Sequence, residues 1–115
     1  MQKDELRLKR CIEAIKAKLV GLGPMRPGAL SKQYNVCGSP GCRCKDPRDP
    51  KKHGPYYQLS YSHTGKSTTE FVRKDHVREV TLQLKTYQVF RKLIDEWVDL
   101  SVQLAKAQRD RSTST

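Results

Sequence analysis

The chain lacks long apolar runs, and it is poor in the residues that build a large hydrophobic core. No uninterrupted apolar stretch approaches the roughly 18 residues of a membrane span. Leucine, isoleucine, valine and phenylalanine together number 24 of the 115 residues, which is about 21%. This share lies just above the roughly 20% below which a highly charged chain is expected to be disordered. We therefore expect a marginal core that a metal, a partner chain or a polyanion helps to stabilise.

Acidic residues are also scarce, since 12 Asp and Glu oppose 23 Lys and Arg and give a formal net charge of +11. The first twenty residues nevertheless contain Asp4, Glu5 and Glu13, unlike a signal or transit peptide. These features predict a soluble cytoplasmic protein with no membrane partner. Cysteine is limited to four residues, three of them within eight positions, which suits a metal site better than a disulfide framework.

The chain has room for one domain, and we expect a single α+β domain over residues 1–115. Steps of three and four between apolar residues predict helices near both ends, whereas all six prolines fall between them. Two runs of aromatic and β-branched residues around Gly65 predict a β-hairpin. The predicted order is a helix over 3–22, a zinc-binding Pro/Gly-rich loop over 23–55, a hairpin over 56–72, a long helix over 75–108 and a disordered tail over 109–115.

One group of cysteine and histidine residues has the composition of a metal site. The pattern C-x4-C-x-C-x8-H places Cys37, Cys42, Cys44 and His53 in the proline-rich loop. Zinc takes four such ligands in a tetrahedron, and four protein ligands leave no position for an activated water. We therefore predict one structural Zn²⁺ per chain. Free thiols in a flexible loop, or a regulatory disulfide, remain the alternatives. Cys11 lies beside Leu8 and Ile15 on the first helix, where we expect a small buried hydrophobe rather than a metal ligand.

The motifs around this group are specific in sequence. They are Met25-Arg26-Pro27-Gly28, Ser31 to Gly38, Pro40-Gly41-Cys42-Arg43-Cys44, His53-Gly54-Pro55-Tyr56-Tyr57, Leu59-Ser60-Tyr61 and Gly65-Lys66-Ser67. Over roughly residues 24 to 104 the chain resembles a family of small uncharacterised prokaryotic proteins that are often encoded near transposases. The resemblance implies a metal site and a setting near mobile elements, and it implies no reaction mechanism.

The excess positive charge is greatest in the middle of the chain. Residues 1–30 carry a net +4, residues 31–66 a net +5 and residues 67–115 a net +2. Six basic residues flank the predicted zinc loop and hairpin and are candidates for binding phosphates: Arg43, Lys45, Arg48, Lys51, Lys52 and Lys66. A nucleic acid, DNA rather than RNA, is the predicted partner, whereas a solvated basic surface or an acidic protein partner would use the same charge.

No group of residues indicates catalysis, so we do not expect an enzyme. Asp95, Glu96 and Asp99 are adjacent on the last helix, where solubilising charge explains them. The sequence thus favours a DNA-binding accessory factor of a mobile element. A protein-interaction adaptor that docks onto a larger enzyme, such as a transposase or nuclease, is a second hypothesis, and a thiol or metal sensor is a third.

The long helix carries more apolar surface than the shorter first helix can cover. At about 1.5 Å per residue the two predicted helices span roughly 30 and 50 Å. The surplus predicts a homodimer that packs helix on helix through Val89, Leu93, Trp97, Leu100 and Leu104. A bend near Ser101, or cover from another protein, would also bury this surface.

Overall fold

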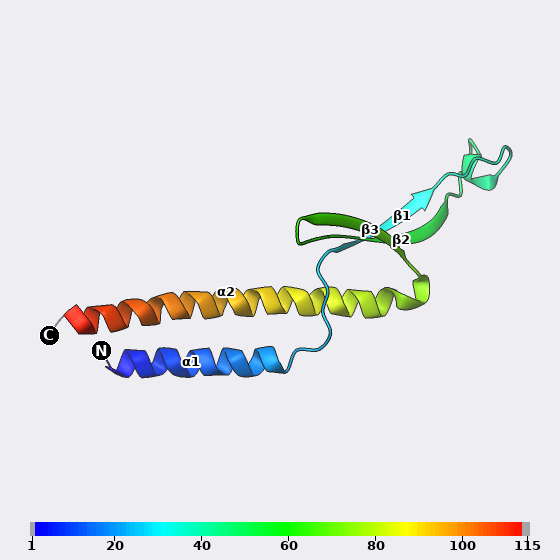
Figure 1. The fold of residues 1–115 in the computed structure, drawn as a ribbon. Helices are drawn as coiled ribbons and strands as arrows, with labels where there is room; N and C mark the ends of the chain where they lie inside the picture. The colour runs from blue at the N-terminus through cyan, green and yellow to red at the C-terminus, as the bar shows by residue number, and fades with distance from the viewer. Residues whose placement is uncertain (1, 114–115) are drawn as a thin grey trace. The chain divides into compact units, whose positions relative to one another are not determined.

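The protein combines two long helices with one small antiparallel sheet, which confirms the predicted α+β class (Figure 1). A computed structural model describes residues 2–113. Its elements in chain order are α1 (Gln2–Val20), β1 (Ala29–Asn35), the 3₁₀ turn η1 (Arg43–Lys45), β2 (His53–His63), β3 (Lys66–Val72), the 3₁₀ turn η2 (Lys74–His76) and α2 (Val77–Thr113). The described residues form two compact units, one of residues 2–24 and 85–113 and the other of residues 25–84. A small domain can contain two such units, so the prediction of a single domain stays a prediction.

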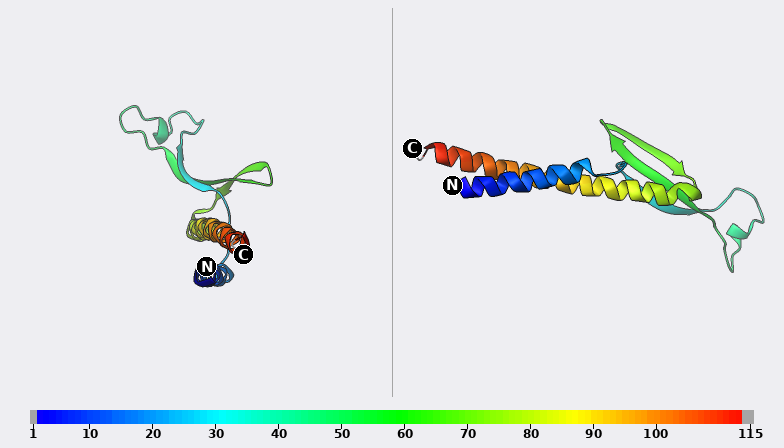
Figure 2. Two further views of the ribbon diagram at one scale, coloured as in Figure 1. Left: turned by 90° about the vertical axis from the view of Figure 1, so that its left-hand side faces the viewer. Right: turned by 90° about the horizontal axis from the view of Figure 1, so that it is seen from below.

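The first unit is an antiparallel pair of helices, in which α1 lies along the C-terminal part of α2 (Figures 1 and 2). Leu8, Ile12 and Ile15 repeat at steps of four and three, so they form one stripe of α1, and all three are buried. Leu93 of α2 is buried as well. The apolar stripe that the sequence predicts in the first helix is therefore the core of this unit. Cys11 lies outside the stripe and is exposed, contrary to the expectation that it is buried.

The end of α2 differs from the predicted disordered tail over 109–115. The helix continues through residues 109–113, while residues 114 and 115 lie outside the described part of the chain. An ion pair explains part of this extension, because the Arg111 guanidinium lies 3.1 Å from a carboxylate oxygen of Glu5, which is only 3% exposed. This contact with α1 thus stabilises helical structure in a segment whose polar composition does not predict a helix.

The second unit contains the sheet, with strand order β1-β2-β3 and antiparallel pairing throughout. β2 and β3 form the predicted hairpin, whereas β1 is a third strand within the segment predicted as a loop. β1 is mostly polar, with the sequence Ala-Leu-Ser-Lys-Gln-Tyr-Asn, so a pattern of alternating apolar residues does not predict it as a strand. Pairing with β2 satisfies its backbone groups instead, so β1 forms through tertiary structure.

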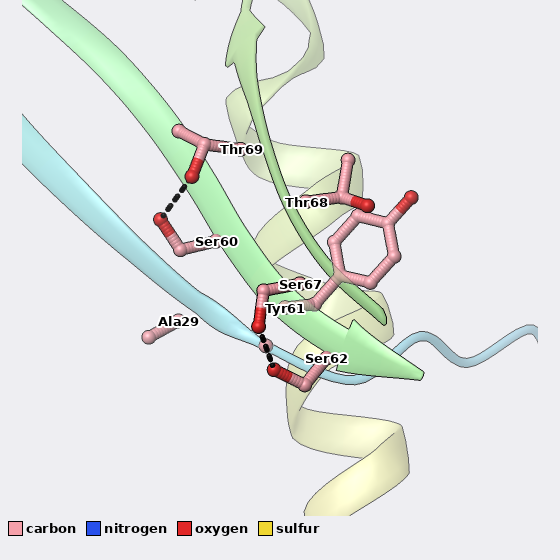
Figure 3. Close-up of a pocket in the computed structure, with 8 residues that line it drawn as sticks. Ala29, Ser60, Tyr61, Ser62, Ser67, Thr68 and Thr69 are labelled. Atoms are coloured by element: carbon pink, nitrogen blue, oxygen red, sulfur yellow. Dashed lines mark hydrogen bonds between the residues drawn. The ribbon is translucent and has the colours of Figure 1, made fainter. Parts of the chain in front are cut away.

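Side chains of the sheet alternate between a core face and an open face. Leu59 is fully buried and packs with Val80 and Leu84 from the first turns of α2, together with partly buried Leu30, Tyr61 and Val72. On the opposite face, hydroxyl groups pair across β2 and β3, Ser60 with Thr69 and Ser62 with Ser67 (Figure 3). The alternation gives this unit one face that packs against α2 and one open face that is mostly polar.

Replacing Leu59 by alanine should destabilise the sheet unit by about 2–5 kcal/mol, because the substitution leaves a cavity in the small core that the helix and sheet share. Denaturant unfolding followed by circular dichroism measures the loss. Leu82→Ala is the matched control, since Leu82 belongs to the same unit and is 65% exposed. Equal effects of the two substitutions would contradict the placement of Leu59 at the centre of the core.

Candidate metal centre

Strand pairing brings the ends of the cysteine-rich loop together. Asn35 at the end of β1 lies opposite His53 at the start of β2, so the loop between them leaves and re-enters the sheet at one place. Cys37 follows β1 by two residues, and Cys44 lies within the turn η1. The antiparallel register therefore brings the first cysteine near the histidine, and the remaining thiols come from Cys44 in the turn and Cys42 just before it.

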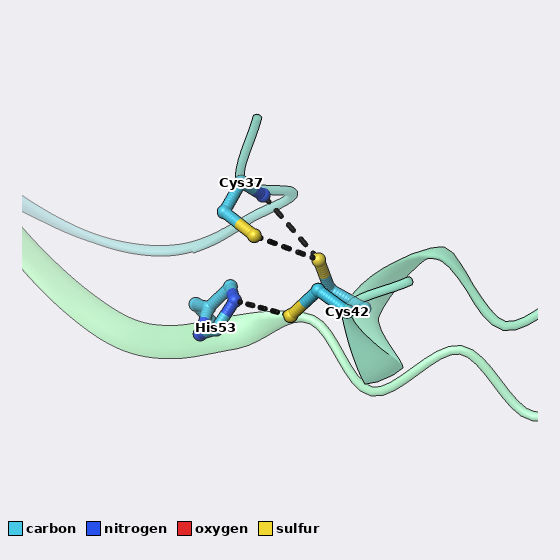
Figure 4. Close-up of side chains that lie close together, drawn as sticks. Cys37, Cys42 and His53 are labelled. Carbon is cyan, nitrogen blue, oxygen red and sulfur yellow. Dashed lines mark hydrogen bonds between the residues drawn. The ribbon is translucent and has the colours of Figure 1, made fainter. Parts of the chain in front are cut away.

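The four predicted ligands form one cluster (Figure 4). Their donor atoms, three Sγ atoms and a ring nitrogen, all lie within 4.8 Å of one another. The Cys37 and Cys44 Sγ atoms are 3.5 Å apart, and the Cys42 Sγ lies 3.2 Å from Nε2 of His53. Cys44 is the most enclosed member at 2% exposure. The sequence pattern thus identified residues that the fold brings within ligand distance of a single ion.

These spacings fit a tetrahedral site. A zinc–sulfur bond of about 2.3 Å at tetrahedral angles places two sulfur ligands about 3.8 Å apart. The Cys37 and Cys44 sulfur atoms, at 3.5 Å, are already close to that separation, so binding of an ion requires only small side-chain adjustments. The backbone N–H of Cys37 points at the Cys44 sulfur from 3.4 Å, which is the kind of support that stabilises a bound thiolate.

The local backbone shapes the loop around the cluster. The Lys45 N–H donates to the carbonyl of Cys42 over 3.0 Å and closes η1, while the Lys51 N–H donates to the carbonyl of Arg43 over 2.9 Å. Gly54 follows the histidine ligand with φ of +141°, and a Cβ there would lie 2.8 Å from the Gln33 carbonyl oxygen. A glycine is therefore required where the chain leaves the cluster and enters β2.

Hydrogen bonds favour the thiolate form of two cysteines. The backbone N–H of Ser39 and the neighbouring cluster side chains lower the pKa of Cys37 to about 6. A backbone hydrogen bond from Cys44 is the main cause of the lowered pKa of Cys42. Burial has the opposite effect on Cys44 and raises its pKa, while hydrogen bonds with Cys37 and Cys42 raise the pKa of His53. The cluster therefore holds charged donors and protons that a cation can displace.

Metal affinity should fall with pH over the whole range from about 8 to about 5, because the pKa of Cys44 is raised, and it should fall most steeply below about 6. Above this pH the Cys37 thiol is ionised, whereas below it protons compete for the same lone pairs. The raised pKa of His53 adds to the loss, because its protonated form persists to higher pH and cannot bind a metal. Competition with a chelator from about pH 5 to about pH 8 measures this dependence. An affinity that is constant over this range would contradict the ionisation of these donors.

The predicted phosphate-binding residues fall into two places. Arg43 and Lys45 lie in η1, and Arg48, Lys51 and Lys52 lie in the same loop, all five exposed. Lys66 instead begins β3 opposite His63, at the far end of β2 from the cluster. The strand between the two places has 11 residues, so its first and last residues are ten steps apart, about 33 Å at 3.3 Å per step. The loop thus presents a group of five cations, and Lys66 is separate from it.

The residues predicted for a dimer interface lie mainly on the face of α2 that α1 covers. Leu93 is buried, and the Lys16 ammonium lies 5.4 Å from the centre of the half-buried Trp97 ring. Leu100 and Leu104 continue this face at steps of three and four and are also half-buried, while Val89 is 47% exposed. The homodimer stays a prediction, but α1 of the same chain occupies much of the surface assigned to it.

Fold and site together define a small α+β protein with a Cys₃His cluster in a basic loop. Residues 3–82 match the family described as a domain of unknown function, DUF6788. The match covers more than half of the chain, so the protein belongs to this family. No curated protein and no solved structure matches the chain. Neither long helix within residues 2–113 has an apolar stretch that could span a bilayer.

Proposed function

We propose that the protein is a zinc-stabilised nucleic-acid-binding protein whose preferred partner is duplex DNA. The observation that carries this proposal is the position of the four clustered donors at the base of a loop with five exposed cations. Three thiolates and an imidazole are a donor set that suits Zn²⁺ among the common metals. Because all four positions belong to the protein, the ion would order the loop rather than activate water, and the proposed role is binding and not catalysis.

Charge in the sheet unit supports a polyanionic partner. Residues 25–84 contain eleven Lys and Arg against five Asp and Glu. A Zn²⁺ ion held by three thiolates adds one net negative charge, so the unit remains strongly positive with the metal bound. An ordered loop holds its cations in fixed positions and lowers the entropy lost when they contact phosphates.

Salt dependence of binding tests the proposal. The zinc-loaded chain should bind duplex DNA, and the logarithm of its affinity should fall linearly with the logarithm of the salt concentration. The slope of this line should be about −0.9 for each neutralised phosphate. Matched duplex RNA and single-stranded DNA in the same titration establish the preferred partner. Absence of binding at low salt, or binding that salt does not weaken, would contradict the proposal.

The resemblance of the motifs to proteins encoded near transposases supports a role as an accessory factor of a mobile element. Docking onto a larger enzyme such as a transposase or nuclease is a second candidate, favoured by Phe71, which is 72% exposed on β3. A thiol or metal sensor is a third, favoured by the low pKa of Cys37. Co-purification at low salt separates these roles, since it identifies the nucleic acid or protein that accompanies the chain.

We also propose that the chain forms a homodimer, with its contact centred on the face of α2 opposite α1. Val98 and Val102 are 57% and 47% exposed, and their helical positions lie away from Leu93 and Trp97. A second copy would bury these valines against the same residues of its own helix. Sedimentation of the pure protein at micromolar concentration should show a dimer, and Val98→Lys should convert it to a monomer. A monomeric wild-type chain would contradict this assembly.

A further inference from the structure

The open face of the sheet carries no charge, in a protein that is 30% charged. Alternate positions of residues 29–33, 56–62 and 67–71 form this face, beginning at Ala29, Tyr56 and Ser67. None of these positions holds an acidic or basic residue. Eight of these ten positions carry hydroxyl or amide groups, and the other two are Ala29 and Phe71, which is 72% exposed. We give the name hydroxyl-amide face to the six that the argument below uses: Gln33, Gln58, Ser60, Ser62, Ser67 and Thr69.

Hydrogen bonds across the strands fix the orientation of these groups. The Gln33 Nε2 donates to the Gln58 Oε1 over 2.7 Å, and the hydroxyls of Ser62 and Ser67 are 2.9 Å apart. Ser60 and Thr69 are paired over 3.3 Å (Figure 3). A carboxamide has two N–H donors and two acceptor lone pairs, so each glutamine keeps bonding capacity beyond the pair. The face thus presents oriented donors and acceptors to solvent.

The shape of the face suits a wide groove. The hairpin of β2 and β3 is a two-stranded ribbon, which is the width of sheet that the roughly 12 Å major groove of B-DNA admits. Side chains near the hairpin end are small, and a shallow hollow of about 350 Å³ lies among Ala29, Ser60 and Thr69. Small side chains allow the backbone to approach a base pair closely. The major groove of A-form RNA is too narrow for such a sheet.

We propose that the hydroxyl-amide face reads base edges in the major groove of duplex DNA and gives the protein a preferred nucleotide sequence. This inference rests on the proposed function, in which cations elsewhere in the unit contact the phosphates. Glutamine pairs with adenine through N6 and N7, and serine and threonine hydroxyls bond to either purine or pyrimidine edges. Because the face has no carboxylate, it meets the phosphate-lined groove without charge repulsion.

Selection from a pool of randomised duplexes tests the inference with the zinc-loaded full chain. The wild-type protein should enrich a defined sequence, which then serves as the probe beside a scrambled duplex of equal composition. Gln58→Glu is the main variant, because the new carboxylate still accepts the hydrogen bond from Gln33 but places a negative charge on the face. Gln88→Glu is the matched control, since Gln88 is exposed on α2 and outside the sheet unit.

Gln58→Glu should reduce the ratio of specific to scrambled affinity by between about fivefold and about 150-fold, the range of one bidentate base contact. Its zinc content and thermal unfolding should match those of Gln88→Glu, which should keep the wild-type ratio. Thr69→Val is a second variant that preserves the β-branched shape and removes one hydroxyl, and it should lower the same ratio.

Two results would overturn the inference, and they are distinguishable. If the wild-type chain binds duplexes without enriching a sequence, or if both face variants keep the wild-type ratio, the face does not read bases while DNA binding itself stands. If the wild-type chain binds no nucleic acid at low salt, the proposed function fails together with the inference.

Discussion

Replacing Cys44 by serine should release the metal and leave residues 36–52 without a fixed structure. Cys44 is the least exposed residue of this segment, and its sulfur lies beside that of Cys37. No apolar core exists in the loop to replace the lost ligand, since most of its residues are exposed. Apparent binding energies of structural zinc reach about 10–16 kcal/mol in small zinc domains, so loss of one ligand removes the main source of order.

Elemental analysis and amide hydrogen exchange measure the two consequences. Wild-type protein should contain about one zinc per chain, and Cys44→Ser should contain almost none and show fast exchange across the loop. Cys11→Ser is the matched control, because Cys11 is exposed on α1 and outside the cluster. Slow exchange in the loop after chelation of the metal would show that the loop folds without it.

The sheet should survive this change, because its core is separate from the cluster. Leu59, Val80 and Leu84 are buried, and the partly buried hydrophobic residues that pack against them, Leu30, Tyr61 and Val72, belong to the strands and not to the loop. Slow exchange in β2 and β3 of Cys44→Ser would accordingly be expected. The proposed metal and the apolar core would thus stabilise different parts of one unit.

The four clustered residues could be identified as candidate ligands from sequence, because thiols and imidazoles are chemically distinctive and few structures other than a metal site bring them together in one loop. Their arrangement could not be predicted, because it depends on β1. The pairing of Asn35 with His53 brings the ends of the loop together, yet β1 has only two apolar residues besides Ala29. Its strand conformation follows from the backbone groups that β2 offers, which composition does not reveal.

Helical periodicity showed correctly that α2 has more than one apolar stripe, but it could not assign a partner to each stripe. Leu93 and Trp97 face α1 within the same chain, whereas Val98 lies on the exposed side. Both stripes have the same period, and the choice between them depends on packing at the level of individual side chains. The extension of α2 to Thr113 has a similar origin, because Arg111 pairs with a residue more than a hundred positions earlier.

Neutralising four cations of the metal loop should make DNA binding less sensitive to salt. The slope of log affinity against log salt concentration should decrease in magnitude by about three to four. The variant replaces Arg43, Lys45, Lys51 and Lys52 by glutamine. All four side chains are exposed in or beside η1, so the substitutions remove charge without disturbing a core. Affinity should fall because binding releases fewer counterions when phosphate contacts are lost. Each lost contact lowers the magnitude of the slope by about 0.9.

A second variant with the same change in net charge distinguishes local contacts from a general effect of charge. It replaces four exposed cations of α2 by glutamine, namely Lys85, Arg91, Lys92 and Lys106. If the loop holds the phosphates, this variant should keep nearly the wild-type slope although both variants have lost four positive charges. Equal slopes for the two variants would mean that binding follows net charge alone. An unchanged slope in the loop variant would instead place the binding surface elsewhere, for which Lys9, Arg10 and Lys16 on α1 are the next residues to replace.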